Sequence, residues 1–268
     1  MCNFVIVNDL SLEEEKLLHK EFPPDMYEYV KVADMVDTNW QPFLNEKTYI
    51  GIAKSNDTIS LLEAHDVGVL GYESTPGEYL SSAYVVQDLC RVERRDLEVV
   101  DARFHNIPLA ILETKRCIIR EHSIEDFQAI LDIYQDKSMT EYIEPLYDGE
   151  EEREYQKKYI DVVYKFYGYG LWLIVDKETG EVIGRAGVES KENCEDINQV
   201  ELSYQVKKEY QNKGIATEVC KAIVNYTFEK LEKKSIIANV NEKNIPSIRI
   251  MEKLGFKPLG NEKYILRK

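Results

Sequence analysis

Residues 201–218, Glu-Leu-Ser-Tyr-Gln-Val-Lys-Lys-Glu-Tyr-Gln-Asn-Lys-Gly-Ile-Ala-Thr-Glu, combine a predicted strand, a polar loop and the start of a helix. Small residues at Gly214 and Ala216 leave the backbone N–H groups at the helix start unobstructed. These N–H groups have no partner inside a helix and carry the positive end of its dipole, so they favour phosphate or pyrophosphate. Lys213 adds positive charge. The alternative is a tight strand-to-helix turn that binds nothing.

The elements around this turn follow a regular order. Apolar patterning predicts strands at 116–120, 171–175, 182–189, 200–206, 235–240 and 264–266, and helices at 123–135, 150–166, 214–231 and 245–254. Ser123 and Asp126 have the spacing of a capping box, and Gly255 stops the last helix. Short links join the strands between 171 and 206, so we expect an antiparallel meander there.

Residues 1–112 have a different pattern. Up to about Asn45 we predict loops with one helix at 12–22. Strands at 48–53, 67–71 and 84–86 then enclose a helix that Asn56 or Asp57 caps and that ends near residue 65, which predicts a βαβ unit with a parallel sheet. Residues 97–104 fit a helix or a strand. We therefore expect a two-domain α/β (α+β) protein, with a Rossmann-like βαβ domain at 1–112 and a second domain at 113–268.

Composition and charge limit the class of protein. Residues 1–112 hold 9 Lys/Arg and 20 Asp/Glu, a charge of −11, and the rest hold 25 and 29, a charge of −4, which together give the net −15. This field disfavours nucleic acid and attracts cations such as amines, although acid can also serve solubility alone. No apolar run reaches the ~18 residues of a membrane span, and the start lacks a secretory signal. Five scattered cysteines indicate reduced thiols in the cytoplasm rather than disulfides or a zinc cluster; they are Cys2, Cys90, Cys117, Cys194 and Cys220.

The stretch Gln211-Asn212-Lys213-Gly214-Ile215-Ala216 resembles the acetyl-CoA signature of the GNAT N-acetyltransferase superfamily, Gln/Arg-x-x-Gly-x-Gly/Ala. Residues 241–256, which end in Glu-Lys-Leu-Gly-Phe, are similar to the family's final helix block. Residues 179–184 are similar to the hairpin between its second and third strands, and residues 116–126 to its first strand and helix. The resemblance covers about 114–268 and is closest to the subgroup of ribosomal-protein N-terminal alanine acetyltransferases. It implies a mixed, mostly antiparallel central sheet flanked by helices.

The resemblance also implies a reaction. A primary amine, on a small molecule or on a protein or peptide, attacks the thioester of acetyl-CoA directly, and no metal is expected. The family supplies a backbone N–H for the oxyanion at the position of Val206. Asn244 matches a residue that contacts the CoA arm, unless it only caps the final helix. The implied cofactor-binding residues are Val206, Gln211, Asn212, Lys213, Gly214, Ile215, Ala216, Thr217 and Asn244.

Glu201 matches the position where some family members carry the general base. An alkylamine has a pKa of ~10 and must lose a proton before it attacks. On the predicted strand Glu201 shares a face with Ser203 and Gln205. The alternatives are an exposed strand carboxylate without a role, and a base at Glu189 or among the acids of 141–148.

The final helix departs from the family. Where many members carry a tyrosine that protonates the leaving thiolate, this chain has Met251, which has no proton to donate. Ser247 lies one turn earlier on the same face and is the catalytic candidate, although it is also an ordinary residue for a helix start. The thiolate, with a pKa of ~8.5, can also leave unprotonated.

An aromatic segment precedes the meander. In the family this part of the chain forms the acceptor pocket, and tyrosines beside acids suit a cation; the alternative is core packing. The residues are Tyr142, Tyr147, Tyr155, Tyr159, Tyr164, Phe166, Tyr167 and Tyr169, with Glu141, Glu144 and Asp148. The histidines, His19, His65, His105 and His122, have no metal-ligand spacing.

Residues 49–55, 67–71 and 83–86 are similar to part of a haloacid-dehalogenase-like hydrolase core, with Ser55 at the place of its Ser/Thr. The Asp-x-Asp nucleophile signature is missing, since residues 5–10 read Val-Ile-Val-Asn-Asp-Leu. We therefore interpret 1–112 as a non-catalytic remnant for packing, homodimer formation or substrate choice. For the whole chain the alternatives to an N-acetyltransferase are a non-enzymatic acyl-CoA-binding regulator and, in the first region, a phosphatase.

Overall fold

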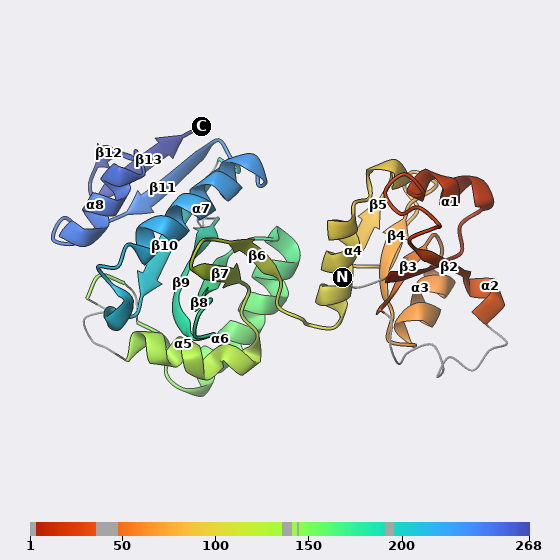
Figure 1. Ribbon diagram of the computed structural model, residues 1–268, viewed down its shortest axis with the longest axis horizontal. Coiled ribbons are helices and arrows are strands. Elements are labelled where there is room, and N and C mark those ends of the chain that lie inside the picture. The colour runs from red at the N-terminus through yellow and green to blue at the C-terminus, as the bar shows by residue number, and fades with distance from the viewer. Residues whose placement is uncertain (1–3, 36–47, 136–140, 144, 191–195) are drawn as a thin grey trace. The chain divides into compact units, whose positions relative to one another are not determined.

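The computed structural model describes residues 4–35, 48–135, 141–143, 145–190 and 196–268 (Figure 1). The chain divides into two compact units, Met1–Ile107 and Pro108–Lys268. The second unit includes strand β6 (Ala110–Glu113), which pairs with β7 (Cys117–Arg120). A boundary at residue 112, as the composition suggested, would cut this strand.

The first unit is a parallel sheet with helices on both faces. Its strands lie in the order β2-β1-β3-β4-β5, and each neighbouring pair is parallel. Two buried clusters form its core, one with residues of α1 and α4 and the other with residues of α2 and α3. The elements are β1 (Phe4–Asn8), α1 (Leu12–Leu18), β2 (Glu28–Lys31), α2 (Val32–Met35), β3 (Thr48–Ala53), α3 (Asn56–Glu63), β4 (Gly68–Tyr72), β5 (Tyr84–Val86), η1 (Leu89–Arg91) and α4 (Arg94–Phe104).

Several sequence predictions for this unit were wrong. Residues 4–35 are not mainly loop, because β1 pairs with both β2 and β3 and so lies inside the sheet; the loops predicted from residue 36 to about Asn45 lie outside the described residues. Helix α1 ends at Leu18 rather than at residue 22. The N-cap of α3 is Ser55, whose hydroxyl accepts from the Thr58 N–H at 3.2 Å, and not Asn56 or Asp57.

The second unit is built on one large sheet in the order β12-β13-β11-β10-β9-β8-β7-β6. Only the pair β10–β11 is parallel; the other neighbours are antiparallel. The remaining elements are η2 (Ile124–Asp126), α5 (Phe127–Tyr134), α6 (Glu150–Lys158), η4 (Tyr159–Tyr167), β8 (Leu171–Asp176), β9 (Val182–Glu189), β10 (Gln199–Val206), η5 (Lys208–Tyr210), α7 (Ile215–Glu229), β11 (Ser235–Asn239), α8 (Ile245–Lys253), β12 (Lys257–Gly260) and β13 (Lys263–Arg267).

Local sequence signals explain much of this unit. Ser123 and Asp126 form the predicted capping box. Asp176 Oδ1 accepts from the N–H groups of Glu178 and Thr179 at 3.0 and 2.9 Å, which closes the predicted turn between β8 and β9. The meander from β8 to β10 is antiparallel, as predicted.

The predicted helix at 150–166 changes form at Tyr159, where the α-helix α6 gives way to the π-helix η4. Tyr164 follows Tyr159 by five positions, the spacing of the π-helical hydrogen bond, so the π-helix places both on one side. The Leu171 N–H donates to Tyr159 Oη at 2.7 Å, and Tyr164 Oη donates to the Leu171 carbonyl at 2.6 Å. The two hydroxyls therefore hold the first residue of β8.

The core of the second unit lies between the sheet and its helices. Trp172 is fully buried there, and α7 contributes Val219, Cys220 and Ile223. Strand β9 approaches the residue before β8 so closely that a Cβ on Gly187 would lie 1.9 Å from the Gly170 carbonyl oxygen. Within the described residues, no helix is both long and apolar enough to cross a membrane.

Candidate acetyl-CoA site

The turn between β10 and α7 depends on left-handed backbone at two positions. Asn212 has φ 58° and Gly214 has φ 79°, a region that favours asparagine and glycine. Gly214 is the N-cap of α7, so the helix begins directly at the turn. Gln211 Nε2 donates to the Val206 carbonyl at 3.0 Å and ties the loop back to the strand. The turn therefore presents the N-terminal N–H groups of a 15-residue helix.

Arg116, distant in sequence, fixes this turn from the side. Its Nη1 donates to the Lys213 carbonyl at 2.8 Å, and its Nε and backbone N–H donate to the Glu218 carboxylate at 2.8 and 3.0 Å. Burial alone would raise the pKa of Glu218, but hydrogen bonds from Thr114 and Arg116 lower it overall. The first turn of α7 is thus held in place before any ligand binds.

Strand β10 separates from β11 as it approaches the turn. It pairs with β9 from Glu201 to Val206, but with β11 only from Gln199 to Glu201. The Lys207 N–H donates to the Ile183 carbonyl on β9 at 2.8 Å. Since N–H directions alternate along a strand, the Val206 N–H points the other way, into the gap between β10 and β11. A chain-like ligand in this gap would meet that N–H.

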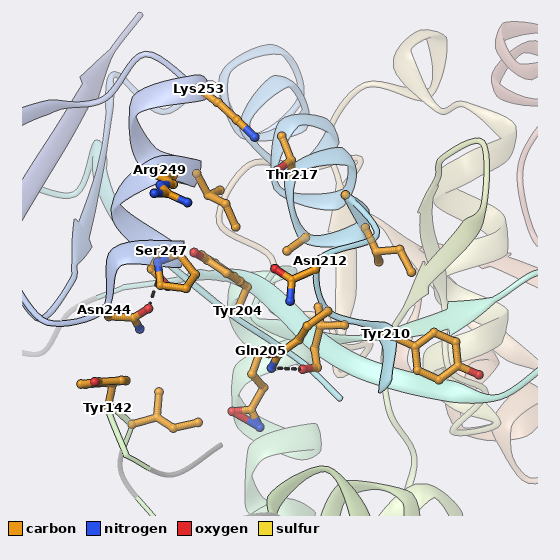
Figure 2. A pocket seen from close by; sticks show the side chains of 18 of the residues that line it. Tyr142, Tyr204, Gln205, Tyr210, Asn212, Thr217, Asn244, Ser247, Arg249 and Lys253 are labelled. Atoms are coloured by element: carbon orange, nitrogen blue, oxygen red, sulfur yellow. Dashed lines mark hydrogen bonds between the residues drawn. The ribbon is translucent and has the colours of Figure 1, made fainter. Parts of the chain in front are cut away.

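A pocket of about 660 Å³ joins this gap to the turn (Figure 2). Three cationic side chains, Lys243, Arg249 and Lys253, lie along its wall beside α8, in a chain with net charge −15. Such a local reversal of charge suits a ligand with several phosphates. Most of the residues implied by the signature line the pocket: Val206, Gln211, Asn212, Gly214, Ile215, Ala216, Thr217, Asn244 and Ser247.

Lys213 and Glu201 are the two predicted site residues that do not line the pocket. The Lys213 ammonium lies over the Tyr210 ring, 5.1 Å from its centre. Glu201 is half-buried where β10 and β11 part, and its Oε1 accepts a hydrogen bond from Asn239 Nδ2. It lies directly opposite Glu189 in the strand pair, and Tyr159 Oη donates to Glu189 Oε1 at 2.6 Å. Two carboxylates thus share one face of the sheet.

The three candidate residues at α8, Asn244, Ser247 and Met251, lie in different environments. Asn244 is the N-cap and accepts from the Ser247 N–H at 3.2 Å, so it caps the helix and also lines the pocket. Ser247 lines the pocket as well. Met251 is fully buried in the core and is not a lining residue. The sulfur of Met251 therefore lies away from the pocket wall.

The aromatic segment divides into core and surface. Tyr159, Tyr164 and Tyr169 are buried, whereas Phe166 is 79% exposed. Of the aromatic residues predicted for an acceptor pocket, Tyr142 is the one that lines the pocket described above. Glu144 lies outside the described residues.

His122 is buried and contacts this aromatic segment. Its Nδ1 lies 2.7 Å from Tyr164 Oη. Burial, and then the charge of Arg185, lower the pKa of His122 to about 3. The histidine is therefore neutral at physiological pH. In the parts of the chain that the structure describes, no group of three or more His, Cys, Asp and Glu side chains could hold a metal ion.

Five further residues line the pocket that were not predicted from the sequence: Tyr204, Gln205, Lys243, Arg249 and Lys253. The strand pattern contained a signal for the first two, because they lie on β10 just before Val206. The three cations line the pocket because the fold brings α8 and the loop before it close to the turn. No local sequence pattern reveals this approach.

The chain matches known proteins in its second unit. The family model described as an acetyltransferase (GNAT) domain matches residues 116–257, more than half of the chain. The uncharacterized N-acetyltransferase YnaD of Bacillus subtilis (strain 168) is 31% identical over 162 residues, which cover 56% of this chain and 90% of YnaD.

Two solved structures show the same fold. A GNAT-family acetyltransferase from Bacillus anthracis has a TM-score of 0.50 and 21% identity, over 58% of this chain and 97% of that one. RimL, a ribosomal alpha-N-protein acetyltransferase, has a TM-score of 0.53 and 13% identity, over 60% of this chain and 95% of RimL.

Proposed function

Because this chain belongs to the GNAT acetyltransferase family, we propose that it transfers the acetyl group of acetyl-CoA to a primary amine by direct attack. The observation that carries this proposal is the continuous path from the helix N-terminus at Gly214 to the gap between β10 and β11. The turn suits a pyrophosphate, and the gap suits a narrow acyl arm that ends in a thioester.

The binding mode follows from the groups along this path. The N–H groups at Gly214, Ile215 and Ala216 face the pyrophosphate, and the three cations beside α8 add attraction for the phosphates. The arm extends along the open edge of β10. The Val206 N–H then donates to the thioester carbonyl oxygen, which gains negative charge when the amine attacks.

Glu201 is our candidate for the group that accepts the amine proton, through a chain of water molecules, because roughly 17 Å of strand at ~3.3 Å per residue separate it from Val206. It lies where the gap closes, on the strand face opposite to the Val206 side chain. A carboxylate there is a suitable base for an ammonium group with a pKa of ~10 only if the water chain connects the two. Ser247 remains our sequence-based candidate for a hydroxyl near the leaving sulfur.

The acceptor is either a small-molecule amine or the amine of a protein or peptide. The resemblance to ribosomal-protein acetyltransferases favours a peptide N-terminus, and the pair Glu189 and Glu201 favours a cationic acceptor of either kind. The test is release of free CoA thiol with polyamines, aminoglycosides, amino acids and basic peptides. Their N-acetylated forms serve as controls. Acetyl-CoA binding without acceptor-dependent release by any compound would instead support an acyl-CoA-binding regulator.

For the first unit we propose a non-catalytic role in packing, dimer formation or substrate choice. At the carboxyl end of β1, where a haloacid-dehalogenase-like enzyme would need its nucleophile, stands Asn8, which is fully buried. Its Oδ1 accepts from Lys31 Nζ at 2.7 Å, and an amide is no nucleophile for phosphoryl transfer. The next residue, Asp9, accepts from the Lys54 N–H at 3.0 Å. A magnesium-dependent phosphate-release assay should give no activity above background.

A further inference from the structure

Tyr204 on β10 lines the pocket with a hydroxyl that has no hydrogen-bond partner among the described residues, although that oxygen is buried. Buried tyrosine hydroxyls are usually hydrogen-bonded, because an unmade bond is costly in the protein interior. Ser247 on α8 acts on the pKa of Tyr204 as a hydrogen-bond partner would, against the effect of burial, although the two hydroxyls do not reach the geometry of an ordinary hydrogen bond. The hydroxyl therefore still has a hydrogen bond to donate.

The pleat of β10 places Tyr204 opposite to the candidate base. Side chains alternate along a strand, so Glu201 and Gln205 share one face and Leu202 and Tyr204 the other. Figure 2 shows Tyr204 and Gln205 pointing in opposite directions, with Tyr204 toward Ser247. An amine that approaches on the Glu201 face would thus push the leaving group toward the Tyr204 face.

The position along β10 agrees with this arrangement. The phosphate turn follows Val206, and the gap closes at Glu201. An acyl arm that starts at the turn runs back along the strand, and Tyr204 lies between these two points. At ~3.3 Å per residue, Tyr204 is roughly 7 Å from Val206 and roughly 10 Å from Glu201 along the strand. Because the Val206 N–H donates to the thioester carbonyl oxygen, the sulfur on the same carbon would lie at the Val206 end of this interval, on the side of Tyr204 rather than of Glu201.

We propose that the Tyr204 hydroxyl donates a hydrogen bond to the thioester sulfur and stabilises the departing CoA thiolate, an inference that rests on the proposed function. The amine lone pair forms the new C–N bond, and the C–S bond then breaks with its electron pair on sulfur. Tyr204 keeps its proton throughout and supplies only the hydrogen bond. The amine proton goes to the base, and the thiolate is protonated by water after release.

Two features separate Tyr204 from the other candidates. Burial raises the pKa of Tyr204, which keeps it a protonated donor at every pH at which the enzyme would act. Met251, at the place of the family's tyrosine, is buried in the core and has no proton to donate. Ser247 lies beside Tyr204 and is the competitor that an experiment must separate from it.

The test is the acidity of the thiol of bound CoA, followed by the ultraviolet absorbance of the thiolate during a pH titration. An ordinary thiol has a pKa of about 8.5. A donor at the sulfur should lower the pKa of bound CoA by about one unit, a tenfold change in acid dissociation, and Tyr204→Phe should restore it. With acetyl-CoA, kcat of Tyr204→Phe should fall about tenfold or more while CoA affinity at neutral pH stays nearly constant.

Tyr264→Phe is the matched control, because Tyr264 on β13 does not line the pocket and should leave both readouts unchanged. A bound thiol in the wild type as weakly acidic as free CoA would overturn the inference without any variant. The inference would also be overturned if the pKa of the bound CoA thiol returned to that of free CoA in Ser247→Ala but not in Tyr204→Phe. If the wild type bound no CoA, the proposed function itself would fail, which is a separate result.

Discussion

Replacement of Glu201 by glutamine removes the basic carboxylate but keeps the size and shape of the side chain. Glu201 Oε1 accepts from Asn239 Nδ2, and a glutamine amide oxygen can accept the same hydrogen bond. The side chain is half-buried and does not line the phosphate-binding pocket, so the fold and acetyl-CoA affinity should remain. Only the capacity to accept a proton from the amine is lost.

The structure gives a narrower range for the loss of kcat that we expect in Glu201→Gln. General-base assistance contributes about 10²–10⁴-fold, or roughly 3–5 kcal/mol at about 1.4 kcal/mol per tenfold. Glu189 lies directly opposite Glu201, and such pairs have Cβ atoms about 5 Å apart. Glu189 can therefore replace part of the lost function, although one of its carboxylate oxygens, Oε1, already accepts the hydrogen bond from Tyr159 Oη. We expect Glu201→Gln to lose about 10²-fold in kcat, and the double variant Glu201→Gln, Glu189→Gln to approach 10⁴-fold.

The assay is a pH–rate profile with one good acceptor for the wild type and for each single variant. Glu201→Gln should recover partly as the pH rises toward the pKa of the amine, ~10, because more acceptor is then already deprotonated. Glu189→Gln alone should stay within several-fold of wild type. If Glu201→Gln stayed within about threefold of wild type at every pH, far from the usual range for a lost base, the role of Glu201 would be refuted. A large loss in Glu189→Gln instead would move the base to Glu189.

Two further predictions concern stability. The isolated fragment 108–268 should unfold in one cooperative transition, because its core cluster is composed of its own residues; a molten fragment by near-ultraviolet circular dichroism would show that residues 1–107 complete that core. For His122, burial and then Arg185 lower the folded-state pKa to about 3, below the ~6.5 of an unfolded histidine. Between these values the unfolded chain binds a proton that the native chain does not, so stability should decrease by about 1.4 kcal/mol per unit as the pH falls from 6.5 toward 3. Urea denaturation at several pH values should show a shallower decrease for His122→Phe, and equal slopes would contradict the assignment.

Local signals made much of the second unit predictable. The pattern at 182–189 gives the bounds of β9, because a turn fixed by Asp176 precedes it and a polar loop follows. Gly255, with φ 85°, ends the last turn of α8 as its position predicts. The turn at Gly214 was visible from residue size alone. These features depend on neighbours in the sequence, which is why the sequence shows them.

Features that depend on distant partners were missed. Strand β2 is half-exposed, has no alternating apolar pattern and is held in place by its pairing with β1. The change to a π-helix at Tyr159 places two hydroxyls on Leu171, a contact that the helical period of 3.6 does not encode. For this reason the sequence did not predict the first two strands of the first unit, β1 and β2.

The same distinction applies to the candidate site. The residues of the turn are contiguous and could be named from the sequence, but Arg116 binds that turn from far away in the chain. Lys213 was expected to add charge to the turn, yet its ammonium lies over Tyr210. The cations that do line the pocket belong to α8 and the loop before it, and only the fold places them there.

Calorimetric titration with acetyl-CoA is the most direct test that the turn at Gly214 holds the phosphates. A Cβ at Gly214 would meet only Arg116 Nη2, at 3.7 Å, so Gly214→Glu has room but places a carboxylate against the pyrophosphate. Gly180→Glu is the matched control: its φ of 73° imposes a similar strain of about 1–2 kcal/mol, and it lies outside the pocket. We predict that the wild type and Gly180→Glu bind acetyl-CoA alike, and that Gly214→Glu folds by circular dichroism but binds at least about 100-fold more weakly, the equivalent of about 3 kcal/mol. Equal affinity in all three proteins would contradict the assignment of this turn as the acetyl-CoA site.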